Sequence, residues 1–208
     1  MQISKPKIKN ELTLITDLHS QFNDSLLTCS TIQSQKINVS INDIRIDECV
    51  FENVDFSKSI FKSCYFIDVI FNKCDLSNLD LSDSTFKRVR FNDCKLMGVN
   101  FDTSSINECV FDNSLMNYVN FSRAKLSLVA INNSLLRESS FVQTDIKNIS
   151  FDKDDFTSSE FLEVNLNNVD FSTSIIDGIS IDLNSIRGIK INSYQSTQLI
   201  SLLKVEVI

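Results

Sequence analysis

Glycine, proline and tryptophan are scarce in this chain of 208 residues, which contains three Gly, one Pro and no Trp. Such a composition excludes a collagen-like chain and argues against disordered and loop-rich proteins. Histidine is nearly missing as well, since His19 stands alone, and the six cysteines include no Cys-x-x-Cys pair. Structural zinc sites need four Cys or His ligands at such spacings, so we expect no metal ion, and without a glycine-rich phosphate loop we expect no cofactor.

Long apolar runs and an excess of basic residues are also missing. No segment has the roughly 20 apolar residues that a membrane-spanning helix needs, and the opening residues from Met1 to Pro6 lack the apolar core of a signal peptide. Asp and Glu number 27 against 20 Lys and Arg, which gives a net charge of −7, whereas a protein held on nucleic acid by counterion release would be basic. We therefore expect a cytoplasmic protein that binds neither a membrane nor nucleic acid, with an acidic surface that suits either a basic partner or simply solubility.

What the chain has instead is an apolar residue at every fifth position from Ile41 to Ile191, without exception. These anchor positions hold every phenylalanine of the chain except Phe22. A helix would repeat its apolar residues every 3.6 positions and a strand every 2, so neither element explains a period of five. A backbone that turns once per repeat does, and the pattern predicts a solenoid. The anchors expected to fill its core include Phe51, Phe71, Phe91, Phe111, Phe151 and Phe171.

A second small or compact residue precedes most anchors by two positions, and the other three positions of each repeat are mostly polar. Two inward and three outward residues per repeat fit a nearly square coil of four repeats, or 20 residues. Five of the six cysteines fall on the small inward position (Cys49, Cys64, Cys74, Cys94 and Cys109). They alternate there with Val and Ser, which is the behaviour of buried, packed thiols.

The two ends of the chain depart from the repeat. Residues 1–21 carry no period and are expected to form an N-terminal cap, and residues 22–193 form the β-helix, with an irregular first coil at 22–40 that is one residue out of phase. Residues 194–208 predict a short helix and tail that either cap the column or also hold a homodimer, because an exposed apolar end must be buried. The residues expected at the dimer interface are Tyr194, Leu199, Ile200, Leu202, Leu203, Val205 and Val207.

Surface charge sorts unevenly over the four sides of a 20-residue coil. The side whose anchors begin at Ile41 and Phe61 carries only two bases, Lys62 and Arg123, whereas the other sides are closer to neutral. Its acidic residues, predicted to bind a partner, are Asp43, Asp80, Asp83, Asp102, Glu160, Glu163 and Asp182. Asp154 falls on an inward position, where a carboxylate predicts a local distortion or a hydrogen bond to a turn rather than catalysis.

With this repeat, the chain resembles the pentapeptide-repeat family. The resemblance implies an all-β solenoid, a right-handed quadrilateral β-helix. The end of the chain, from Ile186 through Gly188 to Ile191 and then Tyr194 and Gln195, looks like the terminus of the quinolone-resistance (Qnr-type) members. The run from Phe86 to Phe141 is similar to the chromosomal type found in Gram-positive bacteria.

The resemblance also implies a function. In Qnr-type members the rod dimerises end to end through its C-terminal module. Its acidic surface imitates duplex DNA and binds the DNA-binding saddle of the A subunit of DNA gyrase, and often topoisomerase IV, which protects the enzyme from fluoroquinolones. The projecting loops of some members are missing here, because the period of five has no insertion.

Two other classes of function remain open. A non-enzymatic interaction scaffold, or adaptor, with a different protein partner would need only the solenoid. An enzyme is the weakest alternative, because the sequence offers no nucleophile–base pair and no metal cluster. We therefore expect no catalytic residues.

Overall fold

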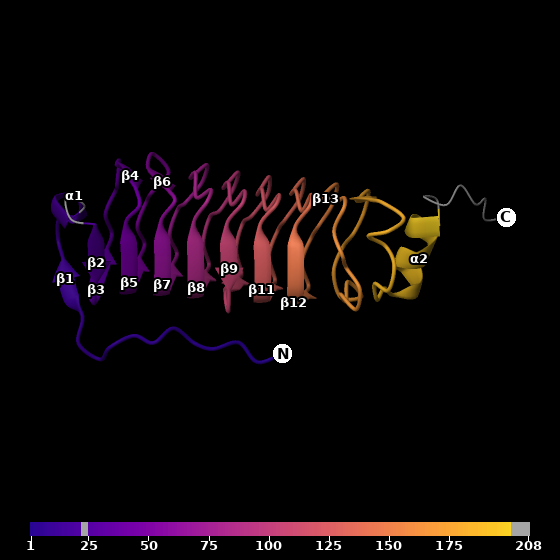
Figure 1. Cartoon of the computed structure of the whole chain (residues 1–208), viewed down its shortest axis with the longest axis horizontal. Helices are drawn as coiled ribbons and strands as arrows, with labels where there is room; N and C mark the ends of the chain where they lie inside the picture. Colours follow the sequence, from indigo (N-terminus) through magenta and orange to yellow (C-terminus); the bar gives the residue numbers. More distant parts are fainter. Residues whose placement is uncertain (22–24, 201–208) are drawn as a thin grey trace.

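Stacked coils form a straight rod with one helix at its far end (Figure 1). The computed structural model describes residues 1–21 and 25–200. Coils are related by 20 residues, since Tyr65 pairs with Thr85 and Phe71 with Phe91. The predicted β-solenoid is thus confirmed.

The described residues form strands of two to eight residues and two helices. In chain order the elements are β1 (Thr13–Ile15), α1 (Leu18–Gln21), β2 (Leu26–Thr28), β3 (Ser30–Gln33), β4 (Ser40–Asn42), β5 (Arg45–Glu52), β6 (Ile60–Lys62), β7 (Tyr65–Asn72), β8 (Thr85–Asn92), β9 (Ser105–Asn107), β10 (Val110–Asp112), β11 (Lys125–Asn132), β12 (Asp145–Asp152), β13 (Glu160–Phe161), β14 (Ser180–Ile181) and α2 (Ser193–Ile200).

Two adjacent sides of the coil form one parallel sheet, and the other two sides are built mostly from turns, with the two-stranded sheets β4-β6 and β13-β14 on one of them. The sheet has ten strands in the order β1-β3-β5-β7-β8-β10-β11-β12, with β2 paired to β5 and β9 between β8 and β11. On the turn sides the anchor carbonyl accepts a hydrogen bond from the residue three positions later, as Leu76 does from Leu79 (3.0 Å). The third residue of that turn, Asn78, has a φ of 60°, as a type II turn requires.

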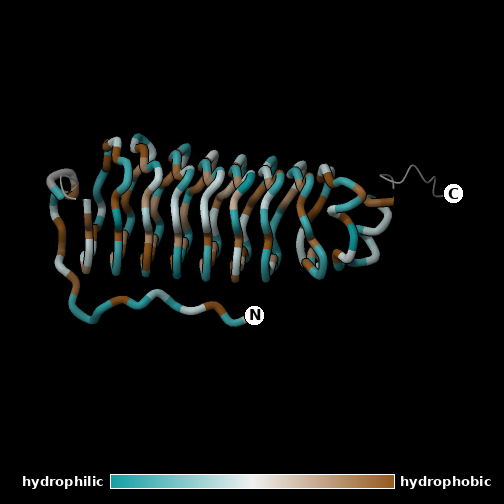
Figure 2. The backbone as a smooth tube through the Cα atoms, viewed as in Figure 1, coloured by the Kyte–Doolittle hydropathy of each residue, from teal (hydrophilic) through white to brown (hydrophobic). Residues whose placement is uncertain are grey.

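The core is a column of aromatic rings inside the rod. Phe51, Phe71, Phe91 and Phe111 stack with ring centroids 5.0, 5.0 and 4.7 Å apart, which matches the separation of neighbouring strands. Hydrophobic and hydrophilic residues alternate along every coil in Figure 2, as expected when two of every five residues point inward.

The cysteines on inward positions are packed in this core. Cys49, Cys64, Cys74, Cys94 and Cys109 are buried free thiols, and Cys29 is half-buried. Burial raises the pKa of Cys49 and Cys109 to about 12 and that of Cys64 to about 11, so these thiols stay protonated at neutral pH.

The N-terminal end of the rod is closed by a shorter coil. Leu27 pairs with Ile46, 19 residues later, whereas Ser40 pairs with Ile60, 20 residues later. β1 extends the sheet beyond β3, and Leu18 of α1 is fully buried. The first ten residues then return along the outside of the rod (Figure 1).

At the other end, α2 lies across the last coil. Asn192 and Gln195 form a reciprocal capping box: each side chain accepts the other's backbone N–H, at 3.0 and 2.9 Å. The Gln195 Nε2 also donates to the carbonyls of Phe171 (2.8 Å) and Ser174 (2.7 Å), and Leu199 is buried in the core. These contacts satisfy backbone groups that the end of a solenoid would otherwise expose.

Candidate interaction surfaces

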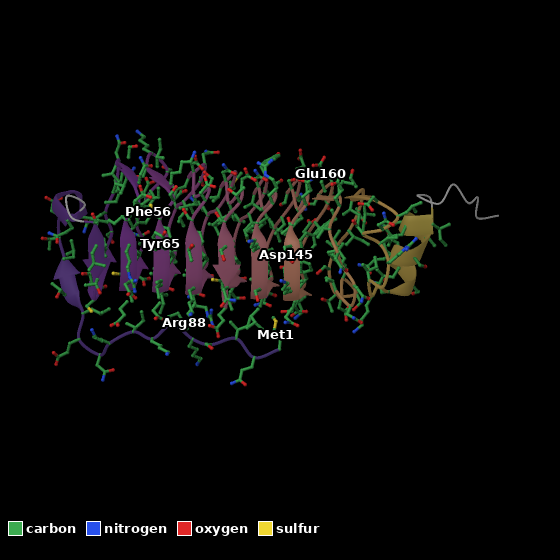
Figure 3. All side chains as sticks on the ribbon, in the orientation of Figure 1. Met1, Phe56, Tyr65, Arg88, Asp145 and Glu160 are labelled. Atoms are coloured by element: carbon green, nitrogen blue, oxygen red, sulfur yellow. The ribbon has the colours of Figure 1, made fainter. Side chains whose placement is uncertain are left out.

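The predicted partner-binding acids lie on one side of the rod, which we call the acidic face. β4, β6 and β13 belong to this side and run along the top of the rod in Figure 1, and Figure 3 places Glu160 there. Parallel bridges link Asp80, Asn100, Asn120, Ser140 and Glu160 into one column. The members of the acidic face are Asp43, Asp80, Asp83, Asp102, Glu160, Glu163 and Asp182.

Neutral donors hold several of these carboxylates in place. Asp80 accepts from the Ser82 N–H and from Asn100 Nδ2, both at 3.1 Å, and Asp83 accepts from the Thr103 hydroxyl at 2.6 Å. Hydrogen bonds from the Ser185 hydroxyl, and then from the N–H groups of Glu163 and Ser185, hold the pKa of Asp182 below its ordinary value. These donors fix the side chains without cancelling their negative charge.

One member of the set is neutralised. Arg123 pairs with both carboxylate oxygens of Asp102, and among the described residues no other member of the acidic face forms an ion pair. Asp80 and Asp83 form one cluster near the middle of the rod, and Glu160, Glu163 and Asp182 form another near its C-terminal end. The Glu163 N–H donates to the Asp182 carboxylate at 2.7 Å, so two members of this second cluster are in direct contact.

The residues predicted at a dimer interface fall into two groups. Tyr194 is 69% exposed on α2, Ile200 is half-buried, and Leu199 is 6% exposed because it packs into the core of its own chain. Leu202, Leu203, Val205 and Val207 lie outside the described residues. Of the described positions, Tyr194 is therefore the side chain most available to a second protomer.

An apolar patch on a turn side has no counterpart in the sequence predictions. It consists of Met97, Leu115, Tyr118 and Leu135, all exposed, and Leu115 bridges to Leu135 in the next coil. The period of five places these residues outward, where single apolar residues are common. Only the 20-residue spacing of Leu115 and Leu135 signals that they adjoin.

The ion pair of Asp68 and Arg88, on the corner of the rod where the first ten residues lie, was not predicted from the sequence. Arg88 binds both oxygens of Asp68, each at 2.6 Å, and the Lys7 N–H donates to the same carboxylate at 2.8 Å. Burial opposes ionisation, but these hydrogen bonds outweigh it and hold the pKa of Asp68 below its ordinary value. The sequence signals for this contact were the three lysines among the first nine residues and the acidic residues at positions 48, 68 and 108, which are spaced by multiples of 20.

The described residues contain no group of three or more His, Cys, Asp or Glu side chains arranged to hold a metal ion. Asp154, the inward carboxylate, accepts from the N–H groups of Ser134 (2.9 Å) and Asp152 (3.1 Å). No helix in the described part of the chain is both long and apolar enough to cross a membrane.

Solved structures with the same kind of repeat resemble the chain at low identity. QnrB1, a plasmid-mediated fluoroquinolone resistance protein, is 22% identical over 86% of this chain and 97% of its own, with a TM-score of 0.41. HetL from the cyanobacterium Nostoc, involved in heterocyst differentiation regulation, is 12% identical over 78% of this chain and 90% of its own, with a TM-score of 0.35. A pentapeptide repeat protein of the Arabidopsis thaliana thylakoid lumen is 20% identical over 63% of this chain and 84% of its own, also with a TM-score of 0.35. No curated protein sequence matches significantly.

Two family models match the repeat directly. A model described as pentapeptide repeats (9 copies) matches residues 46–95, and one described as a pentapeptide repeat region matches residues 84–154. Together the matches span more than half of the chain and coincide with the regular coils of the rod. The chain belongs to the pentapeptide-repeat family.

Proposed function

We propose that the protein is a DNA mimic that binds the DNA-binding saddle of a type II topoisomerase, DNA gyrase or topoisomerase IV, through its acidic face and protects the enzyme from fluoroquinolones. The observation that carries this proposal is the acidic face itself, whose carboxylates, except that of Asp102, form no ion pair among the described residues. The resemblance of the C-terminal motif to Qnr-type members supports the choice of partner.

Rigid carboxylates on a stiff rod suit a surface that evolved to bind phosphates. A β-coil rises about 4.8 Å, so the two clusters of the acidic face, four coils apart, are separated by about 19 Å. A partner with a long basic surface can contact both clusters at once, and the negative field accelerates encounter at low salt. Such binding does not require a catalytic group, so the proposed role is non-enzymatic.

The proposed assembly is a homodimer joined at the C-terminal ends, in the cytoplasm where gyrase acts. A two-fold contact would double the rod and present two acidic faces to a two-fold symmetric enzyme. Tyr194, exposed on α2, is the described residue that we assign to this contact.

The proposal is tested by reversing the charge of three exposed carboxylates, Asp83, Glu160 and Glu163, to Lys. The unpaired charge of the acidic face then changes sign locally, so we expect affinity for gyrase to fall at least tenfold, or about 1.4 kcal/mol. The wild-type affinity should itself weaken as added salt shortens the Debye length from about 10 to 3 Å. Binding is measured with purified gyrase, and protection by supercoiling with and without ciprofloxacin.

The matched control reverses Asp93, Asp112 and Asp170, which lie on a sheet side of the rod, to Lys. It changes the net charge equally but leaves the acidic face intact, so its loss of affinity should be clearly smaller. Equal losses would show that only net charge matters. If neither triple changed binding, or if the wild type neither bound gyrase nor altered supercoiling, the DNA-mimic proposal would be wrong.

A second candidate is a scaffold with a different protein partner, and the apolar patch of Met97, Leu115, Tyr118 and Leu135 favours it. Adjacent exposed apolar side chains are typical of protein interfaces. A scaffold of this kind would lose its partner when Leu115 and Leu135 are replaced by Ser, and would leave supercoiling unchanged. A DNA mimic would show the reverse pattern.

A further inference from the structure

The first ten residues form an extended arm that runs lengthwise along the outside of the rod, across several coils (Figure 1). Figure 3 shows Met1 and Arg88 on the lower side of the rod, away from Glu160 and the acidic face. The arm contains Lys5, Lys7 and Lys9 and no acidic residue. A positively charged, extended segment of this chain is thus bound to a surface of the same chain.

The polar contacts of the arm involve residues from five successive coils. Lys9 Nζ lies 3.3 Å from Glu48 and 3.2 Å from the Cys29 thiol, and the Lys7 N–H donates to Asp68. Further along, the Ser4 hydroxyl donates to Glu108, and the Ser4 carbonyl accepts from Arg90 at 2.5 Å. Ile3, Pro6 and Ile8 are half-buried whereas the three lysines are exposed, so the arm turns its apolar residues toward the rod.

The surface under the arm, which we call the arm site, has a repeating chemistry. Glu48, Asp68, Arg88 and Glu108 follow one another at 20-residue intervals along one corner of the rod. Arg88 pairs with Asp68 and also lies 4.0 Å from Glu108, but one base among three acids still leaves the column with a net negative charge opposite the lysines. Because three of these four positions are acidic and successive coils lie about 4.8 Å apart, the site suits an extended peptide that carries several basic residues.

At its far end the arm site opens into a hollow that the arm does not fill. The ten-stranded sheet ends at β12, and no strand pair or bridge joins β12 to residues 165–172 of the next coil. The hollow there measures about 270 Å³ and is lined by Met1, Ile146, Ile149 and Val169 with asparagines around them. Met1 lines this hollow but remains 60% exposed, so its side chain does not fill the space.

The arm is held weakly for its length. Among the described residues, no backbone–backbone hydrogen bond involves residues 1–10, and the first such bond of the chain is made by the Thr13 N–H. Ordering each residue of an extended segment has a free-energy cost in backbone entropy, and partly exposed ion pairs offset little of that cost. An arm with these contacts opens more readily than the strands beneath it.

We propose that the arm site is a docking surface for an extended basic peptide segment of another protein, and that the N-terminal arm occupies it in the free protein and is displaced on binding. This surface is separate from the acidic face, so the inference goes beyond the proposed function and can hold or fail without it.

The test uses the full chain with its arm released and a fluorescent peptide with the sequence of residues 1–10 as the probe. Lys7→Pro removes the N–H that Asp68 accepts, and Lys9→Glu places a negative charge beside Glu48. We expect this double variant to bind the probe at least tenfold more tightly than the wild type, whose arm competes. A probe with its three lysines replaced by glutamate should bind at least tenfold more weakly.

Adding Glu108→Gln to the released variant removes a negative charge from the arm site and should weaken the binding of the probe at least threefold. The matched control, Asp112→Asn, lies outside the arm site and should leave affinity unchanged. Equal binding of the probe to wild type and released variant, or no effect of Glu108→Gln, would overturn the proposal.

Amide exchange in the wild-type chain tests the same idea without any substitution. The Lys7 N–H should exchange faster than the Phe91 N–H of β8 and faster still when excess probe displaces the arm. Lys7 exchange as slow as that of Phe91, unaffected by the probe, would show that the arm does not open.

Discussion

Left-handed backbone recurs at the second residue after most anchors, in a chain with only three glycines. In the described part of the chain, twenty-six non-glycine residues have φ between 50° and 66°, and Gly98, Gly178 and Gly188 occupy equivalent positions. An L-residue pays about 1–2 kcal/mol for this conformation, which glycine adopts freely. Packing and coil-to-coil hydrogen bonds therefore hold the corners of the rod in place against local preference.

Tyr118 is a position where relief of this strain should be measurable. It has a φ of 63° and is 54% exposed, so little packing is lost on truncation. We expect Tyr118→Gly to raise the free energy of unfolding by up to about 1 kcal/mol, measured by denaturant titration. Gly98→Ala should do the opposite, because a Cβ there would lie 2.6 Å from the Asn78 side-chain oxygen at a φ of 66°. Equal effects of the two changes would contradict this account.

Asp154 makes the stability of the rod depend on pH. Burial is the largest cause that raises the pKa of this carboxyl to about 7, although N–H groups of Ser134 and Asp152 donate to it. A raised carboxyl pKa means that the folded state binds the proton more tightly than the unfolded state. Its stability contribution is therefore complete below about pH 4 and is lost as the pH rises through about 7.

The test is Asp154→Ser, because Ser134 and Ser174 occupy the equivalent position in the coils on either side. We expect this variant to be more stable than the wild type at pH 8, by an amount on the order of 4 kcal/mol at most for three pKa units. The difference should shrink toward pH 4, where the wild-type carboxyl is protonated. Stability curves that stay parallel from pH 4 to pH 8 would rule out this role for Asp154.

At the scale of elements, the sequence predicted the coil but not which of its sides form strands. The anchor pattern is the same on all four sides, yet β7 runs through Phe66 and Phe71 while Leu76 begins a hydrogen-bonded turn. Whether a side forms a strand or a turn depends on its backbone geometry at positions such as Asp68 and Asn78. The identity of these residues varies from repeat to repeat, so it does not predict that geometry. The position of the arm could not be predicted from the sequence either, because its contacts join residues far apart in sequence, Ser4 and Glu108 among them.

For the helix α2, too, the sequence pattern predicted the element but not its contacts. The apolar residues from Leu199 onward predicted a helix at the end of the rod, but the buried role of Gln195 depends on carbonyls of Phe171 and Ser174 in the preceding coil. A periodic pattern predicts which face of an element is apolar, but it does not predict that a polar side chain will donate hydrogen bonds to backbone groups distant in sequence.

We expect Gln195→Ala to destabilise the C-terminal end by roughly 2–4 kcal/mol, because two buried carbonyls lose their donor and the capping box is broken. Amide exchange should rise first in the last coil, at residues such as Lys190, and only later in β8. Thr197→Ala, on the exposed side of the same helix, is the control and should change stability by less than about 0.5 kcal/mol. Uniform destabilisation along the rod would mean that the coils unfold as one unit.

At the scale of the whole molecule, a solenoid has two ends that its own repeat cannot cover. The N-terminal end is closed by the 19-residue coil and Leu18, and the C-terminal end by Gln195 and Leu199 of α2. Leu199 is thus already used within the protomer, which changes how the proposed dimer must be tested. Replacing it would open the core of one chain and would confuse loss of folding with loss of assembly.

Tyr194 separates the two effects, because it is exposed on α2 while its backbone remains in the helix. If the proposed dimer forms through α2, Tyr194→Asp should convert it to monomers at micromolar concentration, since a two-fold contact places the new charge at the interface from both protomers. Sedimentation velocity measures the change, and thermal unfolding checks that the coils stay folded. Tyr118→Asp introduces the same charge at an exposed tyrosine away from the C-terminal end and should leave the dimer intact. A wild-type chain that sediments as a monomer at these concentrations would remove the end-to-end assembly, and with it the argument that one protein presents two acidic faces to a two-fold symmetric partner.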